Sequence, residues 1–309
     1  MSVAPGTDVV TSQAPVPTGW RDQPRVVLAL RILGIFVRNR PAVFGAFILF
    51  GLGIVAAFAP QIAPYDPLEA DLCSACVYQP PTLDHVAGTD LLGRDVLSRT
   101  IHGARIAWQV VVVAIGVAIC IGVPTGLIAG YVGGKLDELL IMRLVDALMA
   151  MPALILILAM TAAVGPNIIN TMLIIGIVWS AGYARLTRGV VLSIMQEPYV
   201  DAARSMGAGP ARIVARHLLP NVIAPVVVLA SLSAAAIILV EAGLSFIGAG
   251  VQQPTPAWGG MVFEGYSNLF RSAWPLMAPG VAVVLMVVSF NFVGDGLRDA
   301  MDPRLRNVR

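Results

Sequence analysis

The sequence predicts an all-α polytopic membrane protein with six transmembrane helices and both termini in the cytoplasm. Of its 309 residues, 57% are hydrophobic and only 12% are charged, and the mean hydropathy is +0.81. A soluble domain is typically about half apolar and a quarter charged. The apolar residues form long unbroken runs rather than the alternating pattern of a transmembrane barrel strand, which favours helices.

The distribution of the basic residues predicts how the spans are oriented. With six spans and an N-terminus inside, only Arg94, Arg99, Arg105 and Arg271 of the 20 Lys and Arg residues fall outside. Cytoplasmic segments of membrane proteins are enriched in basic residues, so this bias supports the topology. The net charge of +2 is small, and nothing in it indicates a nucleic-acid partner.

The N-terminal part reads as a polar tail followed by the first span. Residues 1–24 are rich in Pro, Ser, Thr and Gln and lack an apolar core, which predicts a disordered tail rather than a signal peptide. Val26 to Val37 predicts a short helix on the membrane surface, with arginines around it. The first span is expected over Ala42 to Ile62, which is long enough to cross about 30 Å of hydrocarbon.

A long polar connection, residues 63–104, follows and is expected outside the membrane. It holds Cys73 and Cys76, whereas Cys120 lies in an apolar run. An oxidising exterior permits a disulfide between the first two, and a reduced pair would be a redox or metal candidate. We favour the disulfide because no other ligands cluster nearby, and no metal site is expected.

The same connection carries a dense run of polar residues from His85 to Arg105. One interpretation assigns catalysis to His85, Asp90 and Asp95. No nucleophile or second group of reactive residues accompanies them, so we favour a hydrogen-bonded structural element and assign no catalytic residue.

The second span is expected over Ile106 to Ala129, where Gly116, Gly122 and Gly126 suit close helix packing. The glycine-rich turn that follows ends in Lys135 and therefore has to be tested as a phosphate loop. It fails, because residue 129 is Ala where the motif begins with Gly, and Leu136 follows the lysine. The sequence shows no nucleotide site, so ATP would have to bind another subunit.

The third span is expected over Asp137 to Val164, with a kink at Pro152. Arg143 and Asp146 lie three residues apart on one helix face and could pair. Charges at membrane depth are candidates for function. Because these two lie near the cytoplasmic end, we favour a structural pair over a substrate site.

The last three spans are expected over Thr171–Val191, Val222–Ile247 and Leu276–Val293. Glu241 lies near the outer end of the fifth span, where it either lines a path or anchors neighbouring helix ends. Residues 248–275 are expected outside, with Trp258 and Trp274 in an interfacial belt.

The most charged connection in the second half of the chain is residues 197–221, between the fourth and fifth spans. Pro198 suits the first turn of a helix, and an apolar stripe follows at helical spacing. Gly207 sits where a left-handed C-cap is expected, and Gly209-Pro210 opens a second helix. This helix–hinge–helix either transmits force from a soluble partner or is an ordinary interfacial pair. The stripe consists of Tyr199, Ala202, Ala203 and Met206.

This connection resembles the cytoplasmic loop of ABC importer membrane subunits, which has the form E-A-A-x3-G-x9-I-x-L-P. Here the motif reads Asp201-Ala202-Ala203, then Gly207, then His217-x-Leu219-Pro220, with Asp in place of Glu and His in place of Ile. Three further segments resemble permeases for dipeptides, oligopeptides and nickel: 85–105, 250–259 and 294–306. Just after the first of these segments, Ala107-Trp108 stands where Ser-Leu would be expected.

The resemblance covers roughly residues 30–306 and implies the C-type permease subunit of a dipeptide or oligopeptide importer, with a type I ABC importer fold, in the bacterial inner membrane. It implies a second permease, two ATPase subunits that bind ATP and Mg, an external binding protein and a peptide substrate, with no cofactor in this chain. The loop would couple to the ATPase through Glu197, Tyr199, Asp201, Ala202, Ala203, Arg204, Gly207, Leu219 and Pro220.

The implied organisation has five core helices that line half of a pathway, with the first span against the partner permease. Its segments are a tail (1–24), an interfacial segment and first span (25–62), an extracytoplasmic connection (63–104), a core (105–297, with its coupling loop at 192–221) and a tail (298–309).

Three alternatives stay open at this point. The same architecture could import nickel or another small solute. A stand-alone secondary transporter is less favoured because the sequence shows no convincing internal repeat and few ionisable residues at mid-span. A membrane enzyme built on the His85–Asp95 segment would need a hydrolytic or metal constellation that the sequence does not show.

Overall fold

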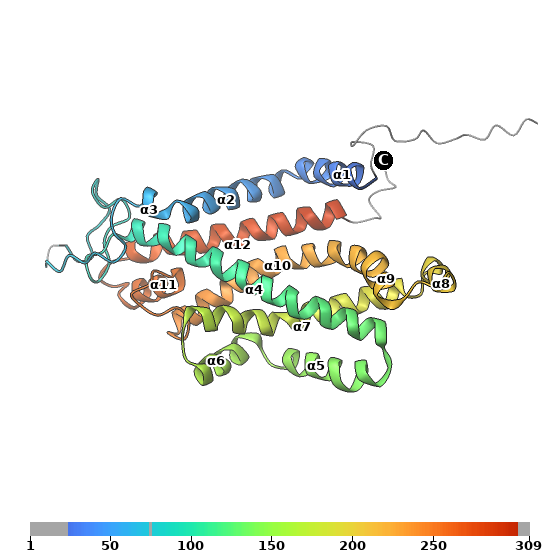
Figure 1. Cartoon of the computed structure of the whole chain (residues 1–309). Helices are drawn as coiled ribbons and strands as arrows, with labels where there is room; N and C mark the ends of the chain where they lie inside the picture. Colours follow the sequence, from blue (N-terminus) through green and yellow to red (C-terminus); the bar gives the residue numbers. More distant parts are fainter. Residues whose placement is uncertain (1–23, 74–75, 302–309) are drawn as a thin grey trace, which may run out of the picture.

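The computed structural model describes residues 24–73 and 76–301, and these form an elongated bundle of helices (Figure 1). Within these residues there is no strand, only an isolated bridge between Thr89 and Asp95. The expected tail over 1–24 lies almost wholly outside the described residues. The elements are α1 (Pro24–Arg38), α2 (Arg40–Ala57), α3 (Ala59–Ile62), α4 (Val96–Val132), the π-helical η2 (Leu136–Ile141), α5 (Met142–Ala150), α6 (Ala153–Val164), α7 (Ile168–Ile194), α8 (Pro198–Ser205), α9 (Pro210–Ile213), the π-helical η3 (Val214–Leu218), α10 (Leu219–Phe246), α11 (Trp258–Ser267) and α12 (Trp274–Met301).

Among the described residues, five helical stretches are long and apolar enough to cross a membrane. They are α2, α4, α7, the continuous run Pro210–Phe246 and α12. A sixth span arises if the pair formed by Asp137–Ala150 and Ala153–Val164 is counted as one broken crossing. The six expected spans are therefore found in the expected order.

The third span departs furthest from a regular helix. Its two halves meet at Met151–Pro152 with a bend of 97°. Pro152 lacks an N–H and its ring clashes with the preceding turn, which is why the kink was expected there. The observed angle is a break between two helices rather than a kink within one.

Several helix ends differ from the expected bounds. The N-terminal end of α4 is Val96, ten residues before the expected Ile106, because the Asp95 carboxylate caps it by accepting from the Ser98 N–H at 2.7 Å. The second helix of the 197–221 connection is not separate, since it continues through η3 into α10. At the C-terminus, α12 extends to Met301, into the segment expected as a tail.

The connection between α10 and α12 contains a helix that the sequence did not reveal, α11. Trp258 opens this helix and is 2% exposed, with its indole N–H donating to the Thr100 carbonyl at 2.9 Å. The expectation that Trp258 belongs to an interfacial belt is therefore wrong, whereas Trp274 is half-exposed. Gly103 makes room for the indole, since a Cβ there would lie 2.4 Å from it.

The most extensive contact between two helices in the described residues joins α4 and α7. It is built on Gly122, Gly126 and Gly130, one turn apart on α4. A Cβ on Gly126 would lie 2.4 Å from the Ala184 carbonyl oxygen, so only glycine lets the backbones approach this closely. Close packing was expected at Gly122 and Gly126, and it is confirmed there. At Gly116 the expectation is wrong, because no atom of the described residues lies within 4 Å of a Cβ placed there.

The close contact of α4 with α7 at these glycines, which we call the seam, predicts opposite outcomes for two Gly→Ala changes in α4. Gly126→Ala pushes a methyl group into the α7 backbone and should lower the free energy of unfolding by about 1–3 kcal/mol. Gly116→Ala meets open space and should be neutral or stabilising by up to about 1 kcal/mol. Unfolding by SDS in mixed micelles measures both, and similar effects would contradict the seam.

Candidate functional site

The bundle has two ends with different polar structures (Figure 1). We call one the α8 end, which carries α8 and α9, and the other the loop end, which carries α11 and residues 63–95. Most sequence-predicted site residues lie toward the α8 end, whereas Cys73, Cys76 and Glu241 lie toward the loop end.

The short helix α8 is bounded by local chemistry at both ends. Pro198 is its first residue, and Glu197 precedes it in an extended conformation. At the other end Gly207 has φ +82°, the Gly207 N–H donates to the Arg204 carbonyl at 2.9 Å, and the Ala208 N–H donates to the Ala203 carbonyl at 3.0 Å. This pair of bonds is a Schellman motif, which closes a helix through a left-handed glycine.

The two faces of α8 differ in their burial. Val200 and Ala203 are buried, and Val200 belongs to an apolar cluster that includes Ile213 and Leu218. Tyr199 is 45% exposed and Met206 82% exposed. Of the four residues of the expected stripe only Ala203 is buried among the described residues, and the others lie on an outward face. The outward residues are Tyr199, Ala202 and Met206.

The remaining residues predicted for this loop surround that face. Asp201 is exposed and lies 3.7 Å from the Arg204 guanidinium, one turn along. The Tyr199 ring lies 5.9 Å from the ring of His217, centroid to centroid. Leu219 and Pro220 are exposed at the start of α10.

The charged residues of the third span do not pair as expected. Asp146 lies 2.5 Å from Arg185 of α7, and Arg143 is exposed with no ion pair in the described part of the chain. Arg188 of α7 makes a two-pronged contact with Asp137, with its Nε 2.8 Å from both carboxylate oxygens. The predicted Arg143–Asp146 pair is thus replaced by two pairs between helices, because α7 lies against this span. Sequence spacing could not reveal these partners.

A cavity of about 870 Å³ lies beside these residues, between α1, α5, α7, α10 and α12. Most of its walls are apolar, and the polar side chains among its lining residues are Arg185, Asn221 and Arg298.

Glu241 is 3% exposed within α10. Its carboxylate accepts from the Ser245 hydroxyl at 2.8 Å, and that hydroxyl accepts from the Val251 N–H at 3.1 Å. The side chain is therefore tied to the turn that ends α10, and it does not line the cavity.

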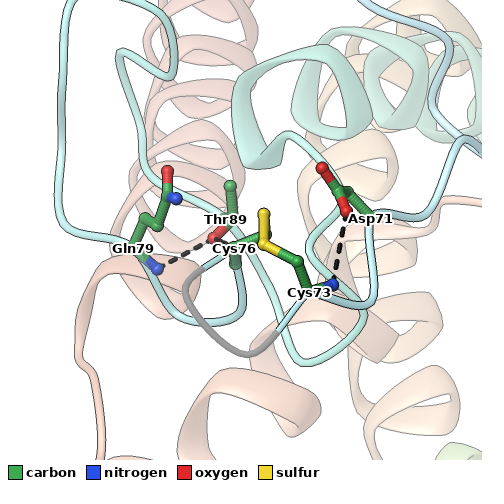
Figure 2. Close-up of a disulfide and its surroundings, with 5 residues drawn as sticks. All are labelled: Asp71, Cys73, Cys76, Gln79 and Thr89. Atoms are coloured by element: carbon green, nitrogen blue, oxygen red, sulfur yellow. Dashed lines mark hydrogen bonds between the residues drawn. A yellow bond between two sulfur atoms is a disulfide. The ribbon is translucent and has the colours of Figure 1, made fainter.

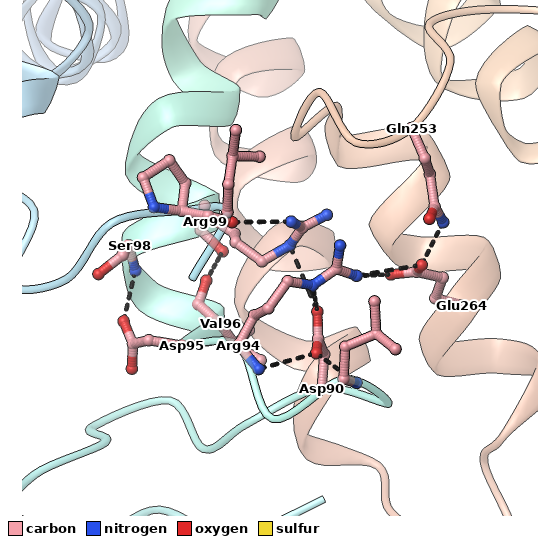
Figure 3. A network of polar contacts seen from close by, with 12 residues as sticks. Asp90, Arg94, Asp95, Val96, Ser98, Arg99, Gln253 and Glu264 are labelled. Carbon is pink, nitrogen blue, oxygen red and sulfur yellow. Dashed lines mark hydrogen bonds and ion pairs between the residues drawn. The ribbon is translucent and has the colours of Figure 1, made fainter. Parts of the chain in front are cut away.

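At the loop end, the polar run of residues 85–105 forms a buried hydrogen-bonded network (Figure 3). The Asp90 carboxylate accepts from Arg94 Nε at 2.7 Å and lies 3.4 Å from Arg99 Nε. Arg94 also reaches Glu264 of α11 at 3.4 Å, and Gln253 donates to that same carboxylate. The expectation of a hydrogen-bonded structural element is confirmed, since the network joins the start of α4 to α11.

A disulfide joins Cys73 and Cys76 beside this network (Figure 2). The Thr89 hydroxyl donates to the Cys76 carbonyl at 2.6 Å and accepts from the Gln79 N–H at 2.8 Å. The backbone of Asp71 lies directly against Gly93: a Cβ on Gly93 would be 2.0 Å from the Asp71 carbonyl oxygen. The disulfide loop is thus held against the turn that contains Asp90.

The network predicts a large effect for the loss of one carboxylate. Asp90→Ala leaves Arg94 and Arg99 buried without their shared partner and should lower the free energy of unfolding by about 3–5 kcal/mol. Asp84→Ala is the matched control, because Asp84 is exposed in the same connection. SDS unfolding measures both, and an Asp90 effect no larger than that of Asp84 would show the network to be unimportant.

Comparison with known proteins adds the family. A family model described as "binding-protein-dependent transport system inner membrane component" matches residues 122–307, and a model of the N-terminal transmembrane domain of oligopeptide transport permease C matches residues 29–81. The chain is 40% identical over 278 residues to the di/tripeptide transport system permease protein DppC of Pseudomonas aeruginosa, with 88% of this chain and 91% of the relative covered.

Two further comparisons agree with these matches. The chain is 37% identical over 272 residues to the glutathione transport system permease protein GsiD of Pectobacterium atrosepticum, covering 88% and 90% of the two chains. A chain from an inward-facing MetNI methionine ABC transporter superposes with a TM-score of 0.54 at 19% identity, covering 66% of this chain and 97% of that one.

These findings confirm the expected importer permease fold and the resemblance to C-type permeases. Permeases of this kind work in a transporter complex with an ATPase and a binding protein. The chain belongs to the binding-protein-dependent transport system inner membrane components: it is a multi-pass permease subunit of a bacterial ABC importer, a transport protein rather than an enzyme.

Proposed function

We propose that this permease forms half of a pathway that imports dipeptides or other short peptides. The observation that carries the proposal is the identity of 40% over almost the whole chain to a permease named for di- and tripeptides. The other half comes from a second, homologous permease. Two ATPase subunits bind ATP and Mg, and an external binding protein delivers the peptide.

The orientation that we propose places the α8 end in the cytoplasm and the loop end outside. The uneven distribution of basic residues supports it, because Arg188, Arg204, Arg212, Arg216 and Arg298 all lie toward the α8 end. The disulfide lies at the loop end, where an oxidising exterior would maintain it. Both termini are then cytoplasmic.

The outward face of α8 is the proposed contact with the ATPase. Tyr199, Ala202 and Met206 present apolar surface that is exposed among the described residues, and the small Ala202 lets a partner approach the helix backbone. Asp201 and Arg204 add exposed charges at the rim of this face. An apolar centre with a polar rim is the usual composition of a protein–protein contact.

The coupling follows from the connection of α8 to two spans. The buried Val200 shares an apolar cluster with Ile194 of α7 and Val222 of α10, so a displacement of α8 would be passed to both helices. ATP binding on the partner subunits would draw two such loops together and shift the bundle from inward-open to outward-open. ATP achieves this only through its different affinity for the two states.

Purification of the tagged chain from mild detergent, with mass spectrometry of its companions, tests the assembly. We expect an ATPase and a second permease to copurify with the tagged chain. In reconstituted vesicles supplied with the binding protein, we expect ATP-dependent uptake of Ala-Ala. Uptake of nickel in place of peptide would overturn the substrate and leave the permease role intact. A chain that stays alone after crosslinking at residues 197–220 would overturn the coupling.

The C-cap of α8 provides a graded test of the coupling role. The backbone at Gly207 is left-handed, and the conformational free energy of this geometry is least favourable for a β-branched residue and less unfavourable for Asn. Gly207→Val should therefore reduce ATP-driven uptake at least about tenfold while the ATPase still hydrolyses ATP, with Gly207→Asn in between. Measured uptake per ATP hydrolysed is the readout.

Gly209→Ala is the matched control, because Gly209 has φ −72° and open space around a Cβ. It should transport as the unaltered protein does. Full transport by Gly207→Val would exclude a coupling role for this cap.

A further inference from the structure

We propose that the face where the broken third span meets α7 is the wall of the aqueous translocation path, and that the Arg185–Asp146 pair presents opposite charges to a zwitterionic cargo there. This assignment rests on the proposed import of short peptides. It names the side of the chain that the cargo passes, which the family alone does not give.

The first observation is an ion pair that is only half buried inside the spans. Arg185 and Asp146 lie 2.5 Å apart, yet their side chains are 49% and 57% exposed. Starting at Thr171, the roughly 20 residues that α7 needs to cross the hydrocarbon run to about Val191 and include Arg185. A long Arg side chain can extend toward the interface, but the short Asp146 carboxylate cannot. Such a pair avoids lipid and faces water or protein.

The comparison with the neighbouring pair strengthens this reading. Arg188 and Asp137 join the same two regions, but the Asp137 side chain is only 3% exposed and accepts from both prongs of the guanidinium. That pair is enclosed and serves to fasten the span to α7. Half-exposed pairs contribute only about 0–1 kcal/mol to stability, so Arg185–Asp146 contributes little as a fastener.

The second observation is the broken backbone at Met151–Pro152. Both residues are exposed and extended, and α5 ends at Ala150 without continuing into α6. The last carbonyl groups of α5 thus lack helical donors. In a membrane, non-helical backbone is tolerated only where it is buried in protein or lines a water-filled space. An exposed break therefore indicates water or a facing subunit on this side.

The third observation is the cavity beside these residues. Met149, Gly182 and Arg185 form part of its wall, and its volume of about 870 Å³ falls in the range of small-molecule sites. Apolar walls with a few polar groups suit peptides with varied side chains, whose constant features are a terminal ammonium and a terminal carboxylate. Arg185, which lines the cavity, matches the carboxylate, and Asp146, its ion-pair partner beside the cavity, matches the ammonium.

Cysteine labelling of the whole transporter in proteoliposomes tests the wall. In a Cys120→Ser background, Met149→Cys and Gly182→Cys sample the cavity, and Val112→Cys and Val284→Cys sample outward faces of α4 and α12. We expect a membrane-impermeant, charged methanethiosulfonate to label the cavity positions in a nucleotide-dependent manner and to leave the control positions unlabelled. The proposal would be overturned if the cavity positions stayed unlabelled in every nucleotide state but reacted in detergent after the subunits had dissociated. That result would show that a facing permease covers this side.

The charge pair is tested with reagents of opposite sign at Gly182→Cys. Arg185→Gln should lower the ratio of the anionic to the cationic labelling rate by about two- to fivefold, and Asp146→Asn should raise it by a similar factor. A purely structural role would change both rates in the same direction, and that result would overturn the charge assignment.

The labelling tests need no peptide, so they separate this proposal from the proposed function. Labelled cavity positions without uptake of Ala-Ala would leave the wall in place and remove the peptide substrate.

Discussion

The close approach of α4 and α7 is the constraint on which the rest of the structure depends. Helices in hydrocarbon gain little from burying apolar side chains against each other, so tight backbone packing has to hold them together. Gly122, Gly126 and Gly130 provide it, because any side chain there would overlap α7. The seam joins the two ends of the protein: α4 begins in the loop-end network, and α7 leads into α8.

The two ends use charge in opposite ways. At the loop end, Asp90, Arg94 and Arg99 are buried, with the Asp90 carboxylate beside both guanidinium groups, and Arg94 also reaches Glu264, which joins the start of α4 to α11. Toward the α8 end, Arg185 and Asp146 pair while remaining half exposed. Buried groups without water must be fully satisfied to be tolerated, whereas exposed ones keep the freedom to exchange partners. One end is built as a fixed frame, and the other is suited to movement.

Most of what the sequence predicted concerned features set by local chemistry. The spans followed from apolar length, the position of the bend in the third span from Pro152, and the C-cap of α8 from Gly207, each of which depends on residues within one or two turns. The errors concerned partners. Arg143 was expected to pair with Asp146 on one helix face, yet Asp146 pairs with Arg185 of α7. Helical spacing shows which residues share a face but not what covers that face.

The sequence by itself determined the membrane class, the order of the spans, the hinge glycine and the likeness to importer permeases, since length, composition and short motifs carry this information. Only the tertiary structure decided that Asp146 pairs with Arg185 rather than Arg143, that Trp258 is buried, and that Gly116 is free while Gly126 is not. The physical reason is that these contacts join segments tens of residues apart. Their geometry is set by how helices pack, and a linear pattern does not contain it.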